Sequence, residues 1–198
     1  AIAMYIKVLE LTDDPSEIFA FIGMEYLFLE DYQKAKSYFI DCLKEDPLDY
    51  SALYNLIYCY DILNQHDEAI VYLNYYLEEN PYCEVAWQQL GKQYYTIKAY
   101  DKALSTYDFA TISDDSFVGA YLEKGKVLER LKRYNEAIEN YQLTLVLEDP
   151  TAFALLRMGH CYEMLGAVEL ALQFYKKTIK EDPVLEKGWM ALANFHYR

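Results

Sequence analysis

The chain has 198 residues, of which 54% are hydrophobic and 25% are charged, so a disordered acidic tail is excluded. Its 32 acidic and 18 basic residues give a net charge of −14, which argues against nucleic acid as a partner because phosphate binding relies on Lys and Arg. No uninterrupted apolar stretch approaches the roughly 18–20 residues of a membrane span, so membrane insertion is not expected.

A pattern of 34 residues recurs along the chain and predicts its organisation. Alanine recurs at this interval at Ala35, Ala69, Ala103, Ala137 and Ala171. Glycine recurs in the same frame at Gly23, Gly91, Gly125 and Gly159, with Ile57 in its place once. The frame predicts five full repeats, residues 16–49, 50–83, 84–117, 118–151 and 152–185. Residues 1–15 are then the second helix of a preceding repeat, and residues 186–198 the first helix of a sixth.

Each repeat is predicted to form two helices. In the first helix, positions 4, 7, 8 and 11 of the repeat share one face at about 100° per residue and carry large apolar residues, except for the small residue at position 8. The recurring glycine predicts a close approach of two helices, so Ile57 predicts a slightly wider spacing in the second repeat. Proline after "KED" or "EEN" is expected to end the second helix.

The stretch "WQQLGKQY" at 87–94, followed by Ala103 and Tyr107, resembles the tetratricopeptide repeat, whose pattern is W-x2-L-G-x2-Y, then A-x3-F, then P. The resemblance covers essentially the whole chain. It implies an all-α fold, with residues 1–198 forming a single right-handed α-solenoid of antiparallel helix pairs: five full repeats and a half repeat at each end. Because the chain opens in mid-repeat and closes on a half repeat, we expect it to be a fragment of a longer protein.

A catalytic or metal site is not expected, and neither is a cofactor. The four cysteines show no metal-ligand spacing and are interpreted as reduced packing residues. His160 and Cys161 are adjacent, but sequence neighbours project about 100° apart on a helix and do not easily share one ion. The sequence contains no Ser/His/Asp set, phosphate loop or paired-histidine motif, so the chain is predicted not to be an enzyme.

The resemblance implies that the first helices line a concave groove, chiefly through positions 2, 5, 9, 12 and 13 of each repeat, with position 6 on the rim. The predicted partner-binding residues are Met24, Phe28, Tyr54, Asn55, Tyr58, Gln88, Lys92, Tyr95, Lys126, Arg130, Arg157 and His160. The N-terminal half of this set is apolar and aromatic, whereas the C-terminal half is basic. Two interpretations of the basic residues remain open: they pair with Glu129 and Glu163 across adjacent helices, or they bind an acidic group or C-terminal carboxylate of a partner.

The leading functional prediction is a non-catalytic scaffold that holds a peptide segment or helix of another protein in the groove. A chaperone-type carboxylate clamp is rejected, because only Asn55 fits its pattern. The alternative is a substrate- or partner-recruiting arm of a larger enzyme or of a secretion or assembly machine, whose active part lies outside this chain. The half repeats at 1–11 and 186–198 are complementary, which predicts possible end-to-end self-association. The lack of a signal peptide and of a disulfide framework favours the cytoplasm.

Overall fold

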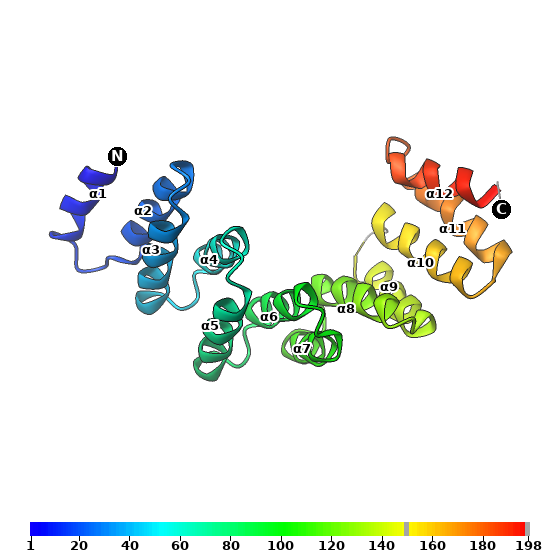
Figure 1. The fold of residues 1–198 in the computed structure, drawn as a ribbon, viewed down its shortest axis with the longest axis horizontal. Helices are drawn as coiled ribbons and strands as arrows, with labels where there is room; N and C mark the ends of the chain where they lie inside the picture. The colour runs from blue at the N-terminus through cyan, green and yellow to red at the C-terminus, as the bar shows by residue number, and fades with distance from the viewer. Residues whose placement is uncertain (149–150, 197–198) are drawn as a thin grey trace. The chain divides into compact units, whose positions relative to one another are not determined.

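The computed structural model describes residues 1–148 and 151–196, and all regular structure in these residues is α-helical (Figure 1). The first helices of the predicted repeats are Ser16–Phe28 (α2), Tyr50–Ile62 (α4), Glu84–Thr96 (α6), Val118–Arg130 (α8), Ala152–Met164 (α10) and Glu186–His196 (α12). The second helices are Ile2–Leu9 (α1), Tyr32–Glu45 (α3), His66–Glu79 (α5), Tyr100–Ser113 (α7), Tyr134–Leu147 (α9) and Val168–Glu181 (α11). The predicted all-α helical-repeat fold is confirmed.

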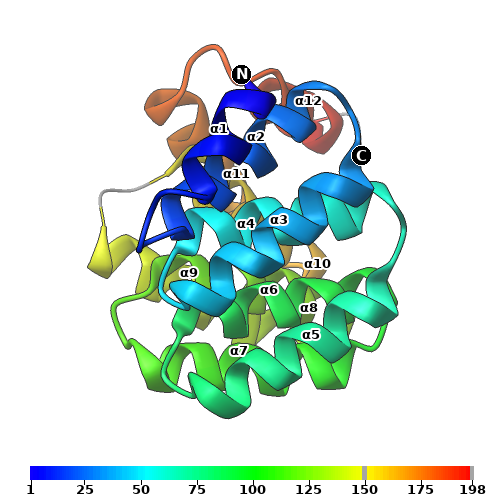
Figure 2. The same ribbon diagram turned by 90° about the vertical axis from the view of Figure 1, so that its left-hand side faces the viewer.

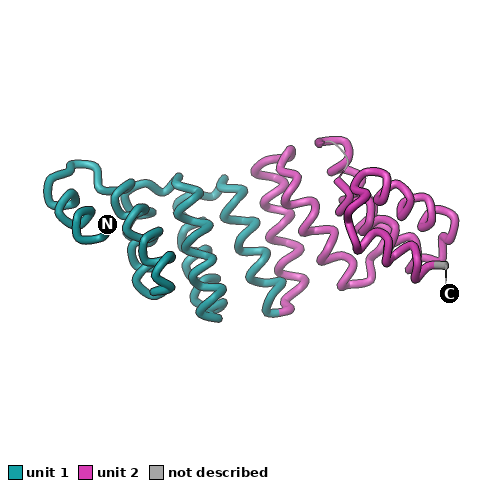
Figure 3. Tube along the Cα trace, turned by 90° about the horizontal axis from the view of Figure 1, so that it is seen from above, with its two compact units in different colours: residues 1–97 teal, residues 98–198 magenta. Residues whose placement is uncertain are grey.

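The helices form two compact blocks, residues 1–97 and 98–198, which are coloured separately in Figure 3. In the N-terminal block α2 packs on α3, α3 on α4, and α5 on α6. In the C-terminal block each helix from α7 to α12 packs on its neighbour along the chain. The boundary falls in the turn between α6 and α7, inside the third predicted repeat. None of the helices in the described parts of the chain combines the length and hydrophobicity that a membrane crossing requires.

The two helices of a repeat meet where a glycine at position 8 faces an aromatic ring at position 24. A Cβ added at Gly23 would lie 2.7 Å from Cε1 of Phe39, and one added at Gly159 would lie 2.6 Å from Cε1 of Tyr175. These rings are buried, so they have little room to retreat. The recurring glycine is therefore required by close packing.

In the second repeat, different residues fill the contact between the two helices. It carries Ile57 at position 8 and Leu73 at position 24, and both side chains are buried. The backbones of α4 and α5 approach each other closely at fewer places than those of α2 and α3. The wider spacing predicted from Ile57 is therefore confirmed.

Proline explains only part of how the second helices end. Helices α3, α5 and α11 end two residues before Pro47, Pro81 and Pro183, as predicted. Helix α7 ends at the same place in its repeat although no proline follows. There Asp114 is extended, and its Oδ1 accepts a hydrogen bond from the Ser116 backbone N–H at 2.9 Å. The same turn follows α3 and α11, where Asp46 and Asp182 accept from the backbone N–H groups two residues on, so the aspartate and not the proline is common to these three helix ends.

The turn between the two helices of each repeat contains one residue with a positive φ angle, at position 15. These residues are Glu30 (58°), Asn64 (53°), Lys98 (62°), Lys132 (59°) and Gly166 (75°). In the fifth repeat the Ala167 N–H donates to the Tyr162 carbonyl at 2.9 Å, which closes the helix end in a Schellman arrangement. Four of the five repeats therefore hold a side chain in a conformation that glycine adopts more easily.

Replacing Gly166 with alanine is expected to lower the free energy of unfolding by about 1 kcal/mol, because an L-residue with positive φ is strained. No atom lies within 4 Å of the position that the added Cβ would occupy, so packing contributes nothing to the loss. The reverse change, Lys132→Gly, is expected to be neutral or slightly stabilising. Chemical denaturation followed by circular dichroism measures both. A loss of stability in Lys132→Gly larger than that in Gly166→Ala would contradict this account.

Candidate partner-binding surface

A trough runs along α10 in the C-terminal block. Its first part is a cavity of about 380 Å³. It is lined by Leu156, Arg157, His160, Glu163 and Met164 of α10, Tyr175 of α11, and Lys187, Met190, Ala191 and Asn194 of α12. A second cavity of about 560 Å³ extends toward the start of α10 and includes Phe153 and Glu186. Both cavities are lined by Leu156, Arg157 and Lys187, so they adjoin each other along α10.

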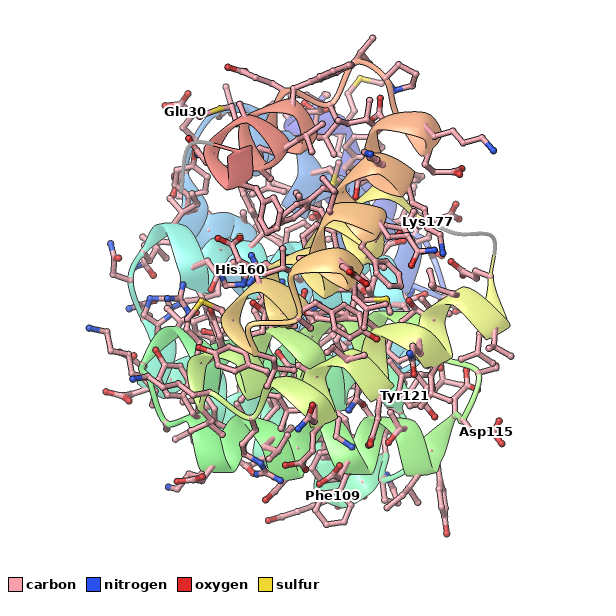
Figure 4. All side chains as sticks on the ribbon, turned by 90° about the vertical axis from the view of Figure 1, so that its right-hand side faces the viewer. Glu30, Phe109, Asp115, Tyr121, His160 and Lys177 are labelled. Atoms are coloured by element: carbon pink, nitrogen blue, oxygen red, sulfur yellow. The ribbon has the colours of Figure 1, made fainter. Side chains whose placement is uncertain are left out.

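The residues that line the first cavity follow the repeat frame. Those from α10 occupy positions 5, 6, 9, 12 and 13 of the fifth repeat, and those from α12 occupy positions 2, 5, 6 and 9 of the next half repeat. His160, which is labelled on α10 in Figure 4, and Arg157 were predicted for this surface. The α12 residues Lys187, Met190 and Asn194 were missed. Applying groove positions 2, 5 and 9 to the half repeat at 186–198 would have found them.

A buried carboxylate lies behind the trough and holds its two basic α10 residues. The Glu129 side chain is only 4% exposed. Its Oε1 accepts hydrogen bonds from the Tyr141 hydroxyl at 2.6 Å and from Arg157 Nε at 2.8 Å. Its Oε2 lies 2.5 Å from Arg157 Nη2 and 3.1 Å from His160 Nδ1. Glu129 of the fourth repeat therefore fixes two side chains of the fifth, as the pairing interpretation predicted.

The protonation of this cluster follows from its contacts. Burial alone raises the pKa of the Glu129 carboxyl, but the hydrogen bonds from His160 and Tyr141 and the Arg157 charge outweigh it, so the pKa lies below its usual value. Burial, followed by the Glu129 charge, raises the pKa of Tyr141. Glu129 is thus ionised, and Tyr141 is a neutral hydroxyl that donates to it.

The fifth repeat contains a shorter version of the same arrangement. There the Tyr175 hydroxyl donates to Oε2 of Glu163 at 2.6 Å. Glu163 and Tyr175 occupy positions 12 and 24, as Glu129 and Tyr141 do in the fourth repeat. Unlike Glu129, Glu163 lines the trough. The trough therefore presents one carboxylate beside its basic side chains.

The predicted residues of the N-terminal block form an exposed aromatic face. Tyr54 and Tyr58 of α4 are 45% and 49% exposed, and Phe28 of α2 is 81% exposed. The Tyr54 hydroxyl donates to Gln88 Oε1 of α6 at 3.3 Å. Asn55 Nδ2 lies 3.3 Å from the sulfur of Met24, which links α4 to α2. The first helices of this block therefore present neighbouring aromatic and apolar side chains on one surface.

Two other predicted basic residues, Lys92 and Lys126, also lie beside acidic groups. Lys92 Nζ lies 3.0 Å from Oδ2 of Asp61 in the preceding repeat, and Lys126 Nζ lies 2.6 Å from Oε1 of Glu123. Arg130 is exposed at the end of α8, and Tyr95 is half-buried on α6. A partner's carboxylate at Lys92 or Lys126 would compete with these pairs, so charge alone does not mark them as a binding site.

Reactive or metal-binding chemistry finds no support at the cysteines. All four are buried thiols, and burial raises the pKa of Cys161 to about 12. Among residues 1–148 and 151–196, no group of three or more His, Cys, Asp and Glu side chains is arranged to hold a metal ion. His160 contacts Glu129 and faces the trough, so its position is explained without a metal.

Repeated helix pairs and a trough built at recurring frame positions define an all-α helical-repeat protein. The family model described as "Tetratricopeptide repeat" matches residues 22–82, 90–153 and 122–185. The chain therefore belongs to the tetratricopeptide-repeat family. No curated protein matches it in sequence.

Several solved structures share this fold. MamA is 22% identical, with a TM-score of 0.71 over 87% of this chain and 94% of its own. YrrB, described as a TPR protein with an unusual peptide-binding site, is 17% identical, with a TM-score of 0.70 over 96% of this chain and 98% of its own. Yeast Tom70 is 16% identical, with a TM-score of 0.77 over 99% of this chain and 42% of its own. At these identities the likeness concerns the fold alone.

Proposed function

We propose that the protein is a non-catalytic interaction scaffold that holds an extended segment or a helix of a partner protein against the first helices of its repeats. The trough along α10 carries this proposal, because its lining residues occupy the frame positions predicted for a binding groove. Helix α10 has 13 residues and is about 20 Å long, which accommodates about six residues of an extended chain. YrrB, with its peptide-binding site on the same fold, is consistent with this use.

The chemistry of the trough indicates which kind of segment it would hold. Leu156, Met164 and Met190 offer apolar contact, while Lys187 and the outer edge of Arg157 offer hydrogen-bond donors. The aromatic face of the N-terminal block would provide further anchors through Tyr54 and Tyr58, since exposed aromatic rings are typical of binding hot spots. The same surfaces would serve equally in a recruiting arm of a larger assembly.

The test is a peptide-display selection against the intact chain, followed by binding measurements on variants. Leu156→Asp and Met190→Asp place charge in the trough and are expected to weaken the selected peptides by about tenfold or more. Tyr58→Ala tests the aromatic face in the same way. Val146→Asp is the matched control, because Val146 is 82% exposed and does not line the trough. Selected peptides that bind the wild type and all three surface variants equally would contradict the proposal.

A further inference from the structure

An open hollow of about 500 Å³ lies along α5, away from the positions that form the proposed groove. It is lined by Tyr60 of α4 and by Asp67, Glu68, Val71, Tyr72 and Tyr75 of α5. Helix α5 crosses the lower part of the view in Figure 2. We refer to these six residues as the α5 hollow.

The α5 hollow exposes a valine at a position where the other repeats are polar. Val71 is 70% exposed and Tyr75 is 65% exposed. The position of Val71 carries a polar residue in each of the other four repeats, namely Ser37, Ser105, Glu139 and Gln173. An exposed valine beside two carboxylates is not needed to build the repeat, since the other repeats form with a polar residue in its place. This combination points to a ligand.

A comparison of repeats within the chain indicates what that ligand is. In the first repeat the ring pair of Tyr26 and Tyr38, with centroids 5.5 Å apart, carries an ammonium group: Lys34 Nζ lies 5.1 Å from the Tyr26 centroid. In the fifth repeat Phe174 stacks on Tyr162 at 5.2 Å, and Lys177 Nζ lies 4.8 Å from the Phe174 centroid. In both repeats the cation comes from the same helix as one ring of the pair. The aromatic pair is therefore a cation site that these repeats fill themselves.

The second repeat keeps the ring pair, but the cation over its Tyr60 ring comes from α3 and not from α5. Tyr60 and Tyr72 lie 6.4 Å apart, and Glu68 stands where the first repeat has Lys34. Lys36 of α3 lies 5.0 Å from the Tyr60 centroid, where it donates to Gln65 Oε1 at 2.7 Å, but it does not line the hollow. Helix α5 thus offers rings and carboxylates without a lysine of its own.

We propose that the α5 hollow binds an arginine side chain of a partner protein. A guanidinium group is planar, so it stacks on a tyrosine ring such as Tyr72 and at the same time donates paired hydrogen bonds to a carboxylate such as Glu68, one helical turn away. A lysine ammonium is not planar, so it cannot stack on a ring and donate paired hydrogen bonds to a carboxylate at the same time. The negative border attracts the cation, in keeping with the net charge of −14. This inference does not depend on the trough along α10.

The test uses NMR titration of the intact, isotope-labelled chain with acetyl-Ala-Arg-Ala-amide. Saturable shifts are expected at the amides of Glu68, Val71, Tyr72 and Tyr75. The same peptide with citrulline, the neutral analogue of arginine, is expected to bind about tenfold more weakly. Equal binding of the two peptides would show that the hollow takes apolar chains and not a cation, which would overturn the proposal. Absence of saturable shifts on α5 would overturn it as well.

A second test changes the protein instead of the peptide and compares Glu68→Lys with a matched control. Glu68→Lys gives the second repeat the lysine that the first repeat has, so it is expected to fill the hollow from within and weaken arginine-peptide binding by about tenfold. Glu139→Lys makes the same charge change on an exposed face of α9 and is expected to leave binding unchanged. Tyr75→Ser removes an exposed ring without touching the core and is also expected to weaken binding. If neither Glu68→Lys nor Tyr75→Ser binds more weakly than Glu139→Lys, the assignment is wrong.

Discussion

Glu129→Ala is expected to lower the free energy of unfolding by about 3 kcal/mol, one of the two largest effects of a single substitution that we predict. The change removes the acceptor for the Tyr141 hydroxyl, which is buried, and for two N–H groups of Arg157. Buried polar groups that lose their partner cost far more than the net strength of the bond itself. Chemical denaturation measures the loss. It should exceed the loss in Glu163→Ala, because Glu163 is less buried.

The pH dependence of the unfolding free energy shows how much of the effect of Glu129 comes from its negative charge. Because the folded-state pKa of Glu129 lies below the ordinary value of 4.5, its ionised form contributes stability above pH 4.5. This contribution is lost as the pH falls through the folded-state pKa. The stability difference between the wild type and Glu129→Gln is therefore expected to shrink below pH 4.5. A difference that stays constant down to pH 3 would mean that the carboxylate charge is not what stabilises the cluster.

Gly23→Ile is expected to lower the free energy of unfolding by about 3 kcal/mol, because the new side chain would overlap the Phe39 ring in a closely packed helix pair. The second repeat shows how such a residue is accommodated, since it combines Ile57 with Leu73. Adding Phe39→Leu to Gly23→Ile reproduces this combination in the first repeat. We expect the double variant to recover about half of the lost stability.

The double-mutant cycle provides the control for this prediction. Phe39→Leu alone removes buried ring volume and is expected to cost about 1–2 kcal/mol. If the two substitutions acted independently, the double variant would be less stable than either single variant. Additive losses would contradict the packing account and would place the role of glycine in the backbone instead. Denaturation of the four proteins under identical conditions gives the coupling energy.

The fold was largely predictable, because the residues that build it recur in one frame. The position of Gly125 or Gly159 in its repeat sets its role in packing, and helix periodicity assigns a face to each neighbour. The same frame placed Arg157 and His160 on the surface that forms the trough. The α12 side of the trough escaped prediction because the groove positions were applied only to the five full repeats and not to the last half repeat.

Other features depend on contacts that periodicity does not encode. Glu129 accepts hydrogen bonds from side chains 12 to 31 residues away in the sequence. A helical pattern predicts which face of the helix carries Glu129, but not which residues it contacts. Sequence reasoning therefore left two interpretations of the basic residues open. Most of the positive-φ turns were similarly not evident from the sequence, since only Gly166 and Asn64 among the five residues are types that favour this conformation. The α5 hollow depends on how side chains of α4 and α5 pack together, which the repeat frame does not encode.

The contacts of Glu129 have a consequence for how the protein opens. In a repeat array each repeat is stabilised by its own packing and by the interface with its neighbour, so single repeats can open locally. Because Glu129 of α8 is bonded to both α9 and α10, local opening of α10 would leave a buried negative charge without its cation. Helices α8, α9 and α10 are thus coupled into one cooperative group, and local opening that spreads from α11 toward α8 must first break the contacts of Glu129.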